Sequence, residues 1–181
     1  MGAKVEGGMK ESANDVASTA SAQETDLSIV SLTWNSMRYL ERMVDSVLED
    51  ARDSGIRLEL IVIDNGSSDG TLERLLDYAR THDELKVVPL GRNTGTTFSR
   101  NIGLRLARGR HILVLDSDTQ IPLGTLTKLL SAGDDIPSDR IGLVAPKLTF
   151  PDGEFQESTR QFPTLKTKLL RLFGSDSARS K

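Results

Sequence analysis

Leu58-Glu-Leu-Ile-Val-Ile63 is a short, almost wholly apolar run, and it leads directly into Asp64-Asn-Gly66, a group of turn-forming residues. Such a run is typical of a strand that is buried on both faces of a parallel sheet. Similar runs begin at Leu27, Leu85 and His111, and segments with helical periodicity separate them. This alternation predicts an α/β fold, in which helices cover both faces of a mainly parallel sheet.

The helical segments are predicted from apolar residues that recur every three or four positions. Asn35 or Ser36 is expected to cap the first helix, and Gly55 to end it. A fourth helix is expected to begin at Pro122. The residues expected to face inward are Leu40, Met43, Val44, Val47, Leu48 and Ala51 in the first helix, Leu72, Leu75, Leu76 and Ala79 in the second, Phe98, Ile102 and Leu106 in the third, and Leu123, Leu126, Leu129 and Leu130 in the fourth.

Two further elements are predicted after the fourth helix. Residues 141–145 have the apolar content of a fifth strand, and residues 147–155 are expected to form a hairpin that turns at Pro151-Asp-Gly153. The folded domain is therefore expected to span residues 27–162. Residues 1–26 contain no aromatic residue and little apolar periodicity, which predicts a disordered tail.

Residues 163–181 are expected to form a short basic amphipathic helix and a frayed end. Its leucines fall on one side of a helix, while Lys166, Lys168 and Arg171 fall largely elsewhere. Such a helix ordinarily packs on its own domain. The alternative is a helix that lies on an anionic membrane, which would hold a cytoplasmic protein at the inner face of the membrane.

The composition narrows the function classes. The 181 residues are 37% hydrophobic and 27% charged, as in ordinary globular domains, and the net charge of −3 argues against a general nucleic-acid-binding protein. The absence of cysteine excludes disulfides and thiolate zinc sites. No apolar run approaches the roughly 20 residues that a membrane-spanning helix needs.

Polar segments follow each predicted strand, and the carboxyl ends of parallel strands are where such sheets bind ligands. Asp116 and Asp118 follow the fourth strand, and two carboxylates at this spacing suit a divalent cation, although aspartates also serve as turn and helix-cap residues. The segment between Glu84 and Asp116 contains no acidic residue but six basic ones. Arg92 and Arg100 lie near the loop end and suit phosphate oxygens, unless they are ordinary surface charges.

Two rival motifs share these residues. Leu115-Asp-Ser-Asp-Thr119 resembles the first motif of haloacid-dehalogenase-type phosphatases, but those enzymes carry it on their first strand. Asp64 resembles the phospho-acceptor of response-regulator receivers, which need an acidic pair after the first strand. This chain has Thr33-Trp-Asn35 there.

Four motifs in order favour another family. They are Leu27-Ser-Ile-Val-Ser-Leu-Thr-Trp-Asn35, Ile61-Val-Ile-Asp-Asn-Gly-Ser-Ser-Asp-Gly-Thr71, Asn93-Thr-Gly95 with Ser99-Arg-Asn101, and Leu115-Asp-Ser-Asp118. Together they resemble family 2 glycosyltransferases, which have the GT-A fold, a Rossmann-like three-layer sandwich that binds nucleotide-diphospho-sugars. The Asp-Asn pair at 64–65, with residues 151–156 and 159–164, is most similar to the rhamnosyltransferase-like branch.

The resemblance implies roles for matching residues. The nucleotide-binding residues would be Thr33, Asn35, Asp64, Asn65, Asn93, Gly95, Arg100 and Asp116, and the metal ligands Asp116 and Asp118. Asn65 departs from the second Asp that many members have, although its carbonyl can still accept a hydrogen bond from a base. The implied ligands are Mg²⁺ or Mn²⁺, a UDP- or dTDP-sugar, and a glycan or lipid-linked acceptor, with inversion at the anomeric carbon.

The catalytic base is the part of this mechanism that the residues do not supply. In the family, the base and most of the acceptor site lie in a segment beyond the point corresponding to Lys181. Asp152, Glu154 and Glu157 lie in the predicted hairpin, where exposed turn polarity is the ordinary explanation. The alternative function is therefore a non-catalytic nucleotide-sugar-binding module that lacks the general base.

Overall fold

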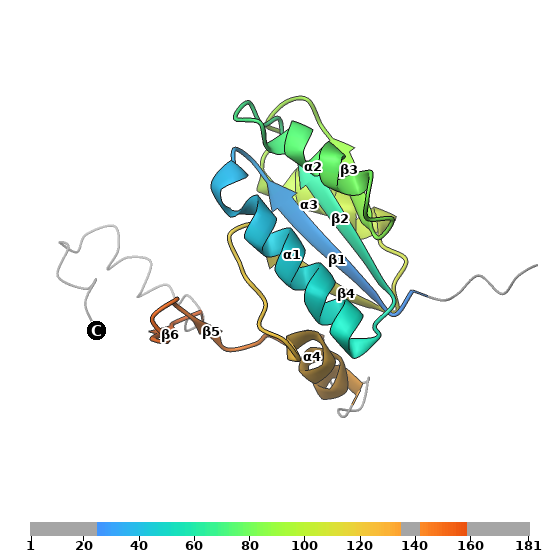
Figure 1. Cartoon of the computed structure of the whole chain (residues 1–181), viewed down its shortest axis with the longest axis vertical. Coiled ribbons are helices and arrows are strands. Elements are labelled where there is room, and N and C mark those ends of the chain that lie inside the picture. The colour runs from blue at the N-terminus through green and yellow to red at the C-terminus, as the bar shows by residue number, and fades with distance from the viewer. Residues whose placement is uncertain (1–24, 135–141, 159–181) are drawn as a thin grey trace, which may run out of the picture. The chain divides into compact units, whose positions relative to one another are not determined.

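The computed structural model describes residues 25–134 and 142–158 (Figure 1). The chain divides into two units, Met1–Leu130 and Ser131–Lys181, which we describe separately. The elements are β1 (Leu27–Thr33), α1 (Met37–Ser54), β2 (Leu58–Asp64), α2 (Thr71–Ala79), β3 (Leu85–Pro89), α3 (Thr96–Leu106), β4 (His111–Asp116), α4 (Thr125–Asp134), β5 (Leu148–Thr149) and β6 (Phe155–Gln156).

The first unit contains a four-stranded sheet in the order β3-β2-β1-β4, and all of its strand pairs are parallel. Every residue of β2 is buried, as its apolar run predicts. The register aligns Thr33 with Asp64 and Leu32 with Asp116, so the polar segments after three strands begin at one edge. The predicted α/β fold with a mainly parallel sheet is confirmed.

Helices cover both faces of this sheet (Figure 1). On one face, α1 and α2 form the main core, in which Leu40, Met43, Val47 and Leu75 are fully buried with side chains of β1 and β2. Burying an aliphatic side chain of this size stabilises the fold by about 1.5–3 kcal/mol. Gly55 ends α1 in the left-handed conformation, with φ +67°, as predicted.

The other face packs against α3, where two of the three residues predicted to face inward are exposed and the third, Ile102, is half-buried. Phe98 and Leu106 are 60% and 46% exposed, whereas Ser99 and Gly103 face the sheet. A Cβ on Gly103 would lie 2.4 Å from Val30 Cγ1, so no larger side chain fits. The apolar periodicity predicted the helix, but it did not reveal that α3 lies too close to β1 for large residues.

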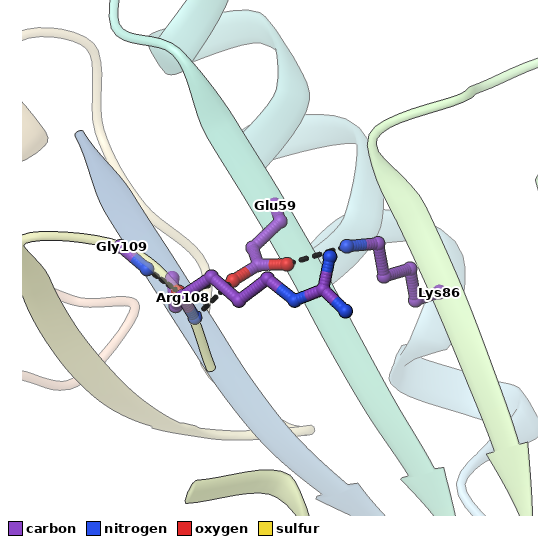
Figure 2. A network of polar contacts seen from close by, with 5 residues as sticks. Glu59, Lys86, Arg108 and Gly109 are labelled. Atoms are coloured by element: carbon purple, nitrogen blue, oxygen red, sulfur yellow. Dashed lines mark hydrogen bonds and ion pairs between the residues drawn. The ribbon is translucent and has the colours of Figure 1, made fainter. Parts of the chain in front are cut away.

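A polar network at the opposite, amino edge of the sheet joins β1, β2 and β3 to the turn that precedes β4. Figure 2 shows Glu59 between Lys86 and the turn at Arg108 and Gly109. Glu59 accepts bonds from Lys86 Nζ at 2.5 Å, the Ser28 hydroxyl at 2.5 Å and the Arg108 N–H at 2.6 Å. Gly109 donates its N–H to Ser28 Oγ at 2.7 Å. The network thereby fixes the turn that leads into β4.

The fourth helix begins at Thr125 rather than at the predicted Pro122. Leu126 is fully buried, but Leu123, predicted to face inward, lies outside the helix and is 58% exposed. In α2, Leu75 is buried but Leu76 is 44% exposed, so the buried face of this helix is narrower than predicted.

In the second unit, β5 and β6 form the predicted antiparallel hairpin around residues 151–153. The fifth strand predicted at 141–145 is wrong for its described part: residues 142–147 form no strand, and Leu143 is 87% exposed. Apolar content alone does not supply a neighbouring strand to pair with. The tail predicted at 1–26, except Thr25 and Asp26, and the segment predicted at 163–181 lie outside the described residues. Within the described ranges, no helix has the length and apolar character needed to cross a bilayer.

Candidate functional site

The segments after β1, β2, β3 and β4 meet at the carboxyl edge of the sheet, and hydrogen bonds join each to a neighbour. The helix after β1 covers one face, while α3, which precedes β4, covers the other (Figure 1). The point between β1 and β4 is therefore a topological switch point, which is where α/β sheets form ligand crevices. The Ser36 and Ser117 hydroxyls lie 3.1 Å apart across this point.

The loop after β1 is joined to the loop after β2. Asn35 adopts a left-handed backbone conformation, with φ 52°, and its side chain accepts the Ser68 N–H at 2.8 Å. The Asn35 N–H donates to Ser67 Oγ at 2.9 Å. Neither Asn35 nor Ser36 caps α1 through its side chain; instead, Asp69 accepts the Met37 N–H at 3.2 Å. A carboxylate from the neighbouring loop thus replaces the predicted cap.

Asp69 is held as a carboxylate by its surroundings. Burial opposes its ionisation, but hydrogen bonds from the Thr71 hydroxyl and the Met37 and Thr71 N–H groups outweigh burial and hold the pKa of Asp69 below its ordinary value. Thr71 Oγ1 in turn accepts the Ser36 N–H at 3.0 Å. These hydrogen bonds join the two loops into one unit.

Asn65 connects the loop after β2 to the loop after β3. Its Oδ1 accepts the Thr94 N–H at 2.8 Å and the Ser99 hydroxyl at 2.9 Å. Its Nδ2 donates to Asn93 Oδ1 at 3.1 Å, and Asn93 Oδ1 also accepts the Gly95 N–H at 3.0 Å. Asn65 is only 3% exposed, so its amide is a buried link between these loops.

Asp64 and Thr33 lie beside each other at the ends of β2 and β1. Asp64 Oδ2 accepts the N–H groups of Gly66 at 3.2 Å and Ser67 at 3.1 Å, which orders the turn. Asp64 Oδ1 and Thr33 Oγ1 are buried and have no hydrogen-bond partner within the described residues. Buried polar atoms of this kind ordinarily bind water or a ligand.

The segment after β4 carries the aspartate pair. Arg100, on α3, donates from Nη2 to Asp116 Oδ1, and the Asp116 side chain is 63% exposed. Asp118 is also exposed. Beyond it, two buried residues of α1 hold the chain: Ser46 Oγ accepts the Ile121 N–H at 3.1 Å, and Asp50 accepts the Leu126 N–H at 2.8 Å. The chain is therefore held both before and after the exposed turn that carries the aspartate pair.

The model of the family described as "Glycosyl transferase family 2" matches residues 28–175. The chain belongs to glycosyl transferase family 2. Among curated relatives, it is 34% identical over 58% of its length to the putative teichuronic acid biosynthesis glycosyltransferase TuaG of Bacillus subtilis (strain 168), and covers 40% of that protein. It is 32% identical over 66% of its length to the succinoglycan biosynthesis protein ExoO of Rhizobium meliloti (strain 1021), and covers 34% of that protein.

The fold of this family 2 chain is similar to that of S. aureus TarS 1–349. Against TarS 1–349 in complex with UDP, the TM-score is 0.54 at 25% identity, with 71% of this chain and 43% of that chain covered. The same fragment in complex with UDP-GlcNAc gives a TM-score of 0.54 at 25% identity, with 71% and 41% covered. The similarity supports the GT-A fold. The chain spans less than half the length of the relatives it matches.

The residues predicted for this family 2 site lie in one region, but not in one contact network. Asp64, Asn65, Asn93 and Gly95 are joined through the loops after β2 and β3, and Arg100 is joined to Asp116. Within the described ranges, no group of three or more acidic or histidine side chains is placed to hold a metal. The donor set is nevertheless suitable for a cation, because Mg²⁺ is usually held by one or two carboxylates together with water and substrate phosphates. Asp116 and Asp118 would be those carboxylates.

Several residues of this family 2 site were not predicted from the sequence. Ser36 and Ser117 meet across the switch point, Asp69 caps α1, and Asp50 and Ser46 hold the segment after Asp118. The Asp69-Gly-Thr71 sequence before α2 is a turn and cap signal that could have indicated Asp69. No local signal indicates Asp50, because its partners lie more than 70 residues further along the chain.

Proposed function

We propose that this family 2 chain binds a nucleotide-diphospho-sugar together with a divalent cation, for transfer of the sugar to an acceptor hydroxyl with inversion. The observation that carries the proposal is the carboxyl edge of the sheet, where Asp116 and Asp118 lie exposed beside Arg100 and an ordered set of loops. The fold similarity to TarS 1–349, whose structures include UDP and UDP-GlcNAc complexes, supports a nucleotide-sugar ligand.

The proposed roles follow from the contacts. Thr33, Asn35 and Asp64 would line the nucleoside pocket, with Thr33 Oγ1 and Asp64 Oδ1 as buried atoms without protein partners in the described ranges. Asn65 would act beside the base mainly by holding the loop that carries Asn93 and Gly95, because its amide is already bonded to that loop.

The diphosphate would lie between Arg100 and the aspartate pair, where arginine suits phosphate oxygens. Asp116 and Asp118 would hold Mg²⁺ or Mn²⁺, and such a cation neutralises charge on a departing diphosphate. In the inverting reaction, the acceptor oxygen bonds to the anomeric carbon, the bond to the diphosphate oxygen breaks, and a carboxylate takes the acceptor proton. The nucleoside diphosphate then leaves with the bonding electron pair.

A second candidate function is a donor-binding module without its own base. Within the described ranges, the carboxylates that we locate at this edge are engaged or assigned: Asp64 and Asp69 hold the loops, Asp116 binds Arg100, and Asp118 would hold the cation. None of them is left to accept the acceptor proton. In the hairpin, Asp152 accepts the Glu154 N–H at 3.0 Å, which is ordinary turn chemistry.

We further propose that the donor is a dTDP-sugar or a UDP-sugar and that the acceptor is a glycan or a lipid-linked molecule, as the motifs of the rhamnosyltransferase-like branch favour. A lipid-linked acceptor agrees with a cytoplasmic protein held at the inner membrane face by the basic segment at 163–181. Co-sedimentation with phosphatidylglycerol vesicles tests this placement: binding should fall when Lys166, Lys168 and Arg171 are changed to glutamine, and unchanged binding excludes the segment as the anchor.

Thermal unfolding with UDP, dTDP or GDP, each with and without Mn²⁺, tests the donor site. A ligand that binds only the folded state at 100 times its Kd stabilises that state by about 2.7 kcal/mol. We expect stabilisation by UDP or dTDP that requires Mn²⁺ and disappears in Asp118→Ala. Asp53→Ala, which removes an exposed carboxylate from α1, is the matched control. No stabilisation by any nucleotide would show that the site is wrongly assigned.

Donor turnover then separates the two candidate functions. An enzyme that carries its own base should release nucleoside diphosphate from UDP- or dTDP-sugars when an acceptor hydroxyl is supplied, and Asp118→Ala should abolish that release. A donor-binding module should show the metal-dependent stabilisation without turnover.

A further inference from the structure

The contact between Arg100 and Asp116 joins the middle of α3 to the end of β4. Arg100 Nη2 donates to Asp116 Oδ1, and the two side chains are 34% and 63% exposed. Arg100 Nε is buried and has no hydrogen-bond partner in the part of the chain that the structure describes. The guanidinium thus places one of its donors on the carboxylate that is also the candidate metal ligand.

This ion pair is weak enough to be exchanged. Exposed pairs contribute little to stability, because water screens the attraction and ordering two long side chains costs entropy. A guanidinium has five N–H donors, so Arg100 can engage a second anion without any change in its charge. The pair between Glu59 and Lys86 differs in its carboxylate, since the Glu59 side chain is only 4% exposed, whereas the Lys86 side chain is 50% exposed.

A guanidinium and a divalent cation repel each other when both lie against one carboxylate. Water screens this repulsion as it screens the pair itself, but a doubly charged ion is repelled twice as strongly as a singly charged one at the same distance. The two cations lie side by side more favourably when further negative charge lies between them. A diphosphate supplies that charge.

We propose that Arg100 is the resident counter-cation of Asp116, that a divalent cation must displace it, and that the diphosphate of a nucleotide removes this competition by binding the released guanidinium. This inference rests on the proposed function. It predicts that cation alone binds weakly and that cation and nucleotide strengthen each other. Linkage requires the strengthening to be equal in both directions.

Calorimetric titration with Mn²⁺ alone, and again with saturating UDP or dTDP, measures this coupling. In the wild-type chain, the nucleotide should raise Mn²⁺ affinity by at least about fivefold, the lower end of typical coupling. In Arg100→Gln, Mn²⁺ alone should bind more tightly, by up to about fivefold, which is the most that an exposed pair contributes. The nucleotide, which still ligates the cation through its phosphates, should raise Mn²⁺ affinity by less than in the wild-type chain and should itself bind more weakly. Arg105→Gln, which removes an exposed arginine from the last turn of the same helix, should behave as wild type.

Arg100→Lys is the second variant, because it keeps the positive charge but loses the planar fork. Its Mn²⁺ affinity should lie between those of wild type and Arg100→Gln. If Arg100→Gln binds Mn²⁺ alone no more tightly than wild type, or if the nucleotide raises its Mn²⁺ affinity as much as in the wild-type chain, the inference is wrong while the donor site stands. If the wild-type chain binds neither Mn²⁺ nor nucleotide, the proposed function fails first and this inference fails with it.

Discussion

The two edges of the parallel sheet each carry an ion pair between neighbouring elements, and the carboxylates of the two pairs differ in burial. At the amino edge, Glu59 binds Lys86 with a carboxylate side chain that is 4% exposed (Figure 2). At the carboxyl edge, Asp116 binds Arg100 with a side chain that is 63% exposed. Leaving the partners of a buried carboxylate unsatisfied costs several kcal/mol, whereas an exposed pair contributes little. The same pairing chemistry therefore stabilises the fold at one edge and remains available to a ligand at the other.

The largest expected effect on stability comes from truncating Glu59, the buried carboxylate at the amino edge. Glu59→Ala removes the acceptor of the Arg108 N–H and of the Ser28 hydroxyl, and it should lower the free energy of unfolding by about 2–4 kcal/mol. Urea unfolding followed by circular dichroism measures this loss. Glu49→Ala, on the exposed side of α1, is the matched control and should change stability by less than about 0.5 kcal/mol. A loss for Glu59→Ala as small as that of the control would mean that the network contributes nothing.

A smaller effect is expected at Asp50, which connects α1 to the segment after the aspartate pair. Asp50→Ala leaves the N–H groups of Gly124 and Leu126 without their acceptor, and should lower the free energy of unfolding by about 1–3 kcal/mol. Because Asp50 holds the segment beyond Asp118, Mn²⁺ binding in the presence of nucleotide should also weaken. Asp53→Ala on the same helix should change neither quantity. Unchanged Mn²⁺ binding in Asp50→Ala would show that this anchor serves stability alone.

These residues show what the sequence could and could not predict. Leu58–Ile63 predicted a buried parallel strand, since apolar content and length are local properties, and the structure places it at the centre of the sheet as β2. The inward face of α3 was predicted wrongly, because the clearance between Gly103 and Val30 is a property of packing and not of periodicity. At the site, the position of Asp64, Asn65 and Asp116 directly after predicted parallel strands was enough to predict that they lie at the same edge of the sheet. The sequence could not show that Arg100, rather than another of the six basic residues, binds Asp116.

The third effect is the pH dependence of stability that comes from the Glu59 carboxylate. Burial alone would raise the pKa of Glu59, but hydrogen bonds from Lys86, Ser28 and the Arg108 N–H outweigh burial and hold the pKa below the ordinary 4.5. The folded state therefore binds a proton less readily than the unfolded state. This contribution to stability is fully present above pH 4.5 and is lost as the pH falls through the folded-state value.

Glu59→Gln should therefore lose less stability than wild type between pH 5 and pH 3, when each is measured by urea unfolding. The difference should be smaller than the effect of Glu59→Ala, because glutamine still accepts hydrogen bonds. Some pH dependence should remain in the variant, since the hydrogen bonds from Arg57 lower the pKa of Asp26 to about 2. Equal slopes for the two proteins would show that the Glu59 carboxylate is not preferentially ionised in the folded state.

The smallest effect on stability is expected for Asp116, the exposed carboxylate at the carboxyl edge. Asp116→Asn should change the free energy of unfolding by less than about 1 kcal/mol, because the pair with Arg100 is screened by water. Mn²⁺ binding in the presence of nucleotide should nevertheless fall by at least about tenfold, since a carboxylate is a far better ligand for a hard cation than an amide. Asp53→Asn is the matched control for both measurements.

Glu59→Gln supplies the converse of Asp116→Asn, because it should lower stability while the folded protein keeps its wild-type affinity for Mn²⁺ and nucleotide. If Asp116→Asn lowers stability as much as Glu59→Ala, then the exposed pair is also structural, and Arg100 cannot be released at low cost. If Asp116→Asn keeps its stability but loses metal binding, Asp116 serves the ligand and not the fold. Its exposed pairing with Arg100 then contributes too little to stability to prevent a ligand from replacing Arg100.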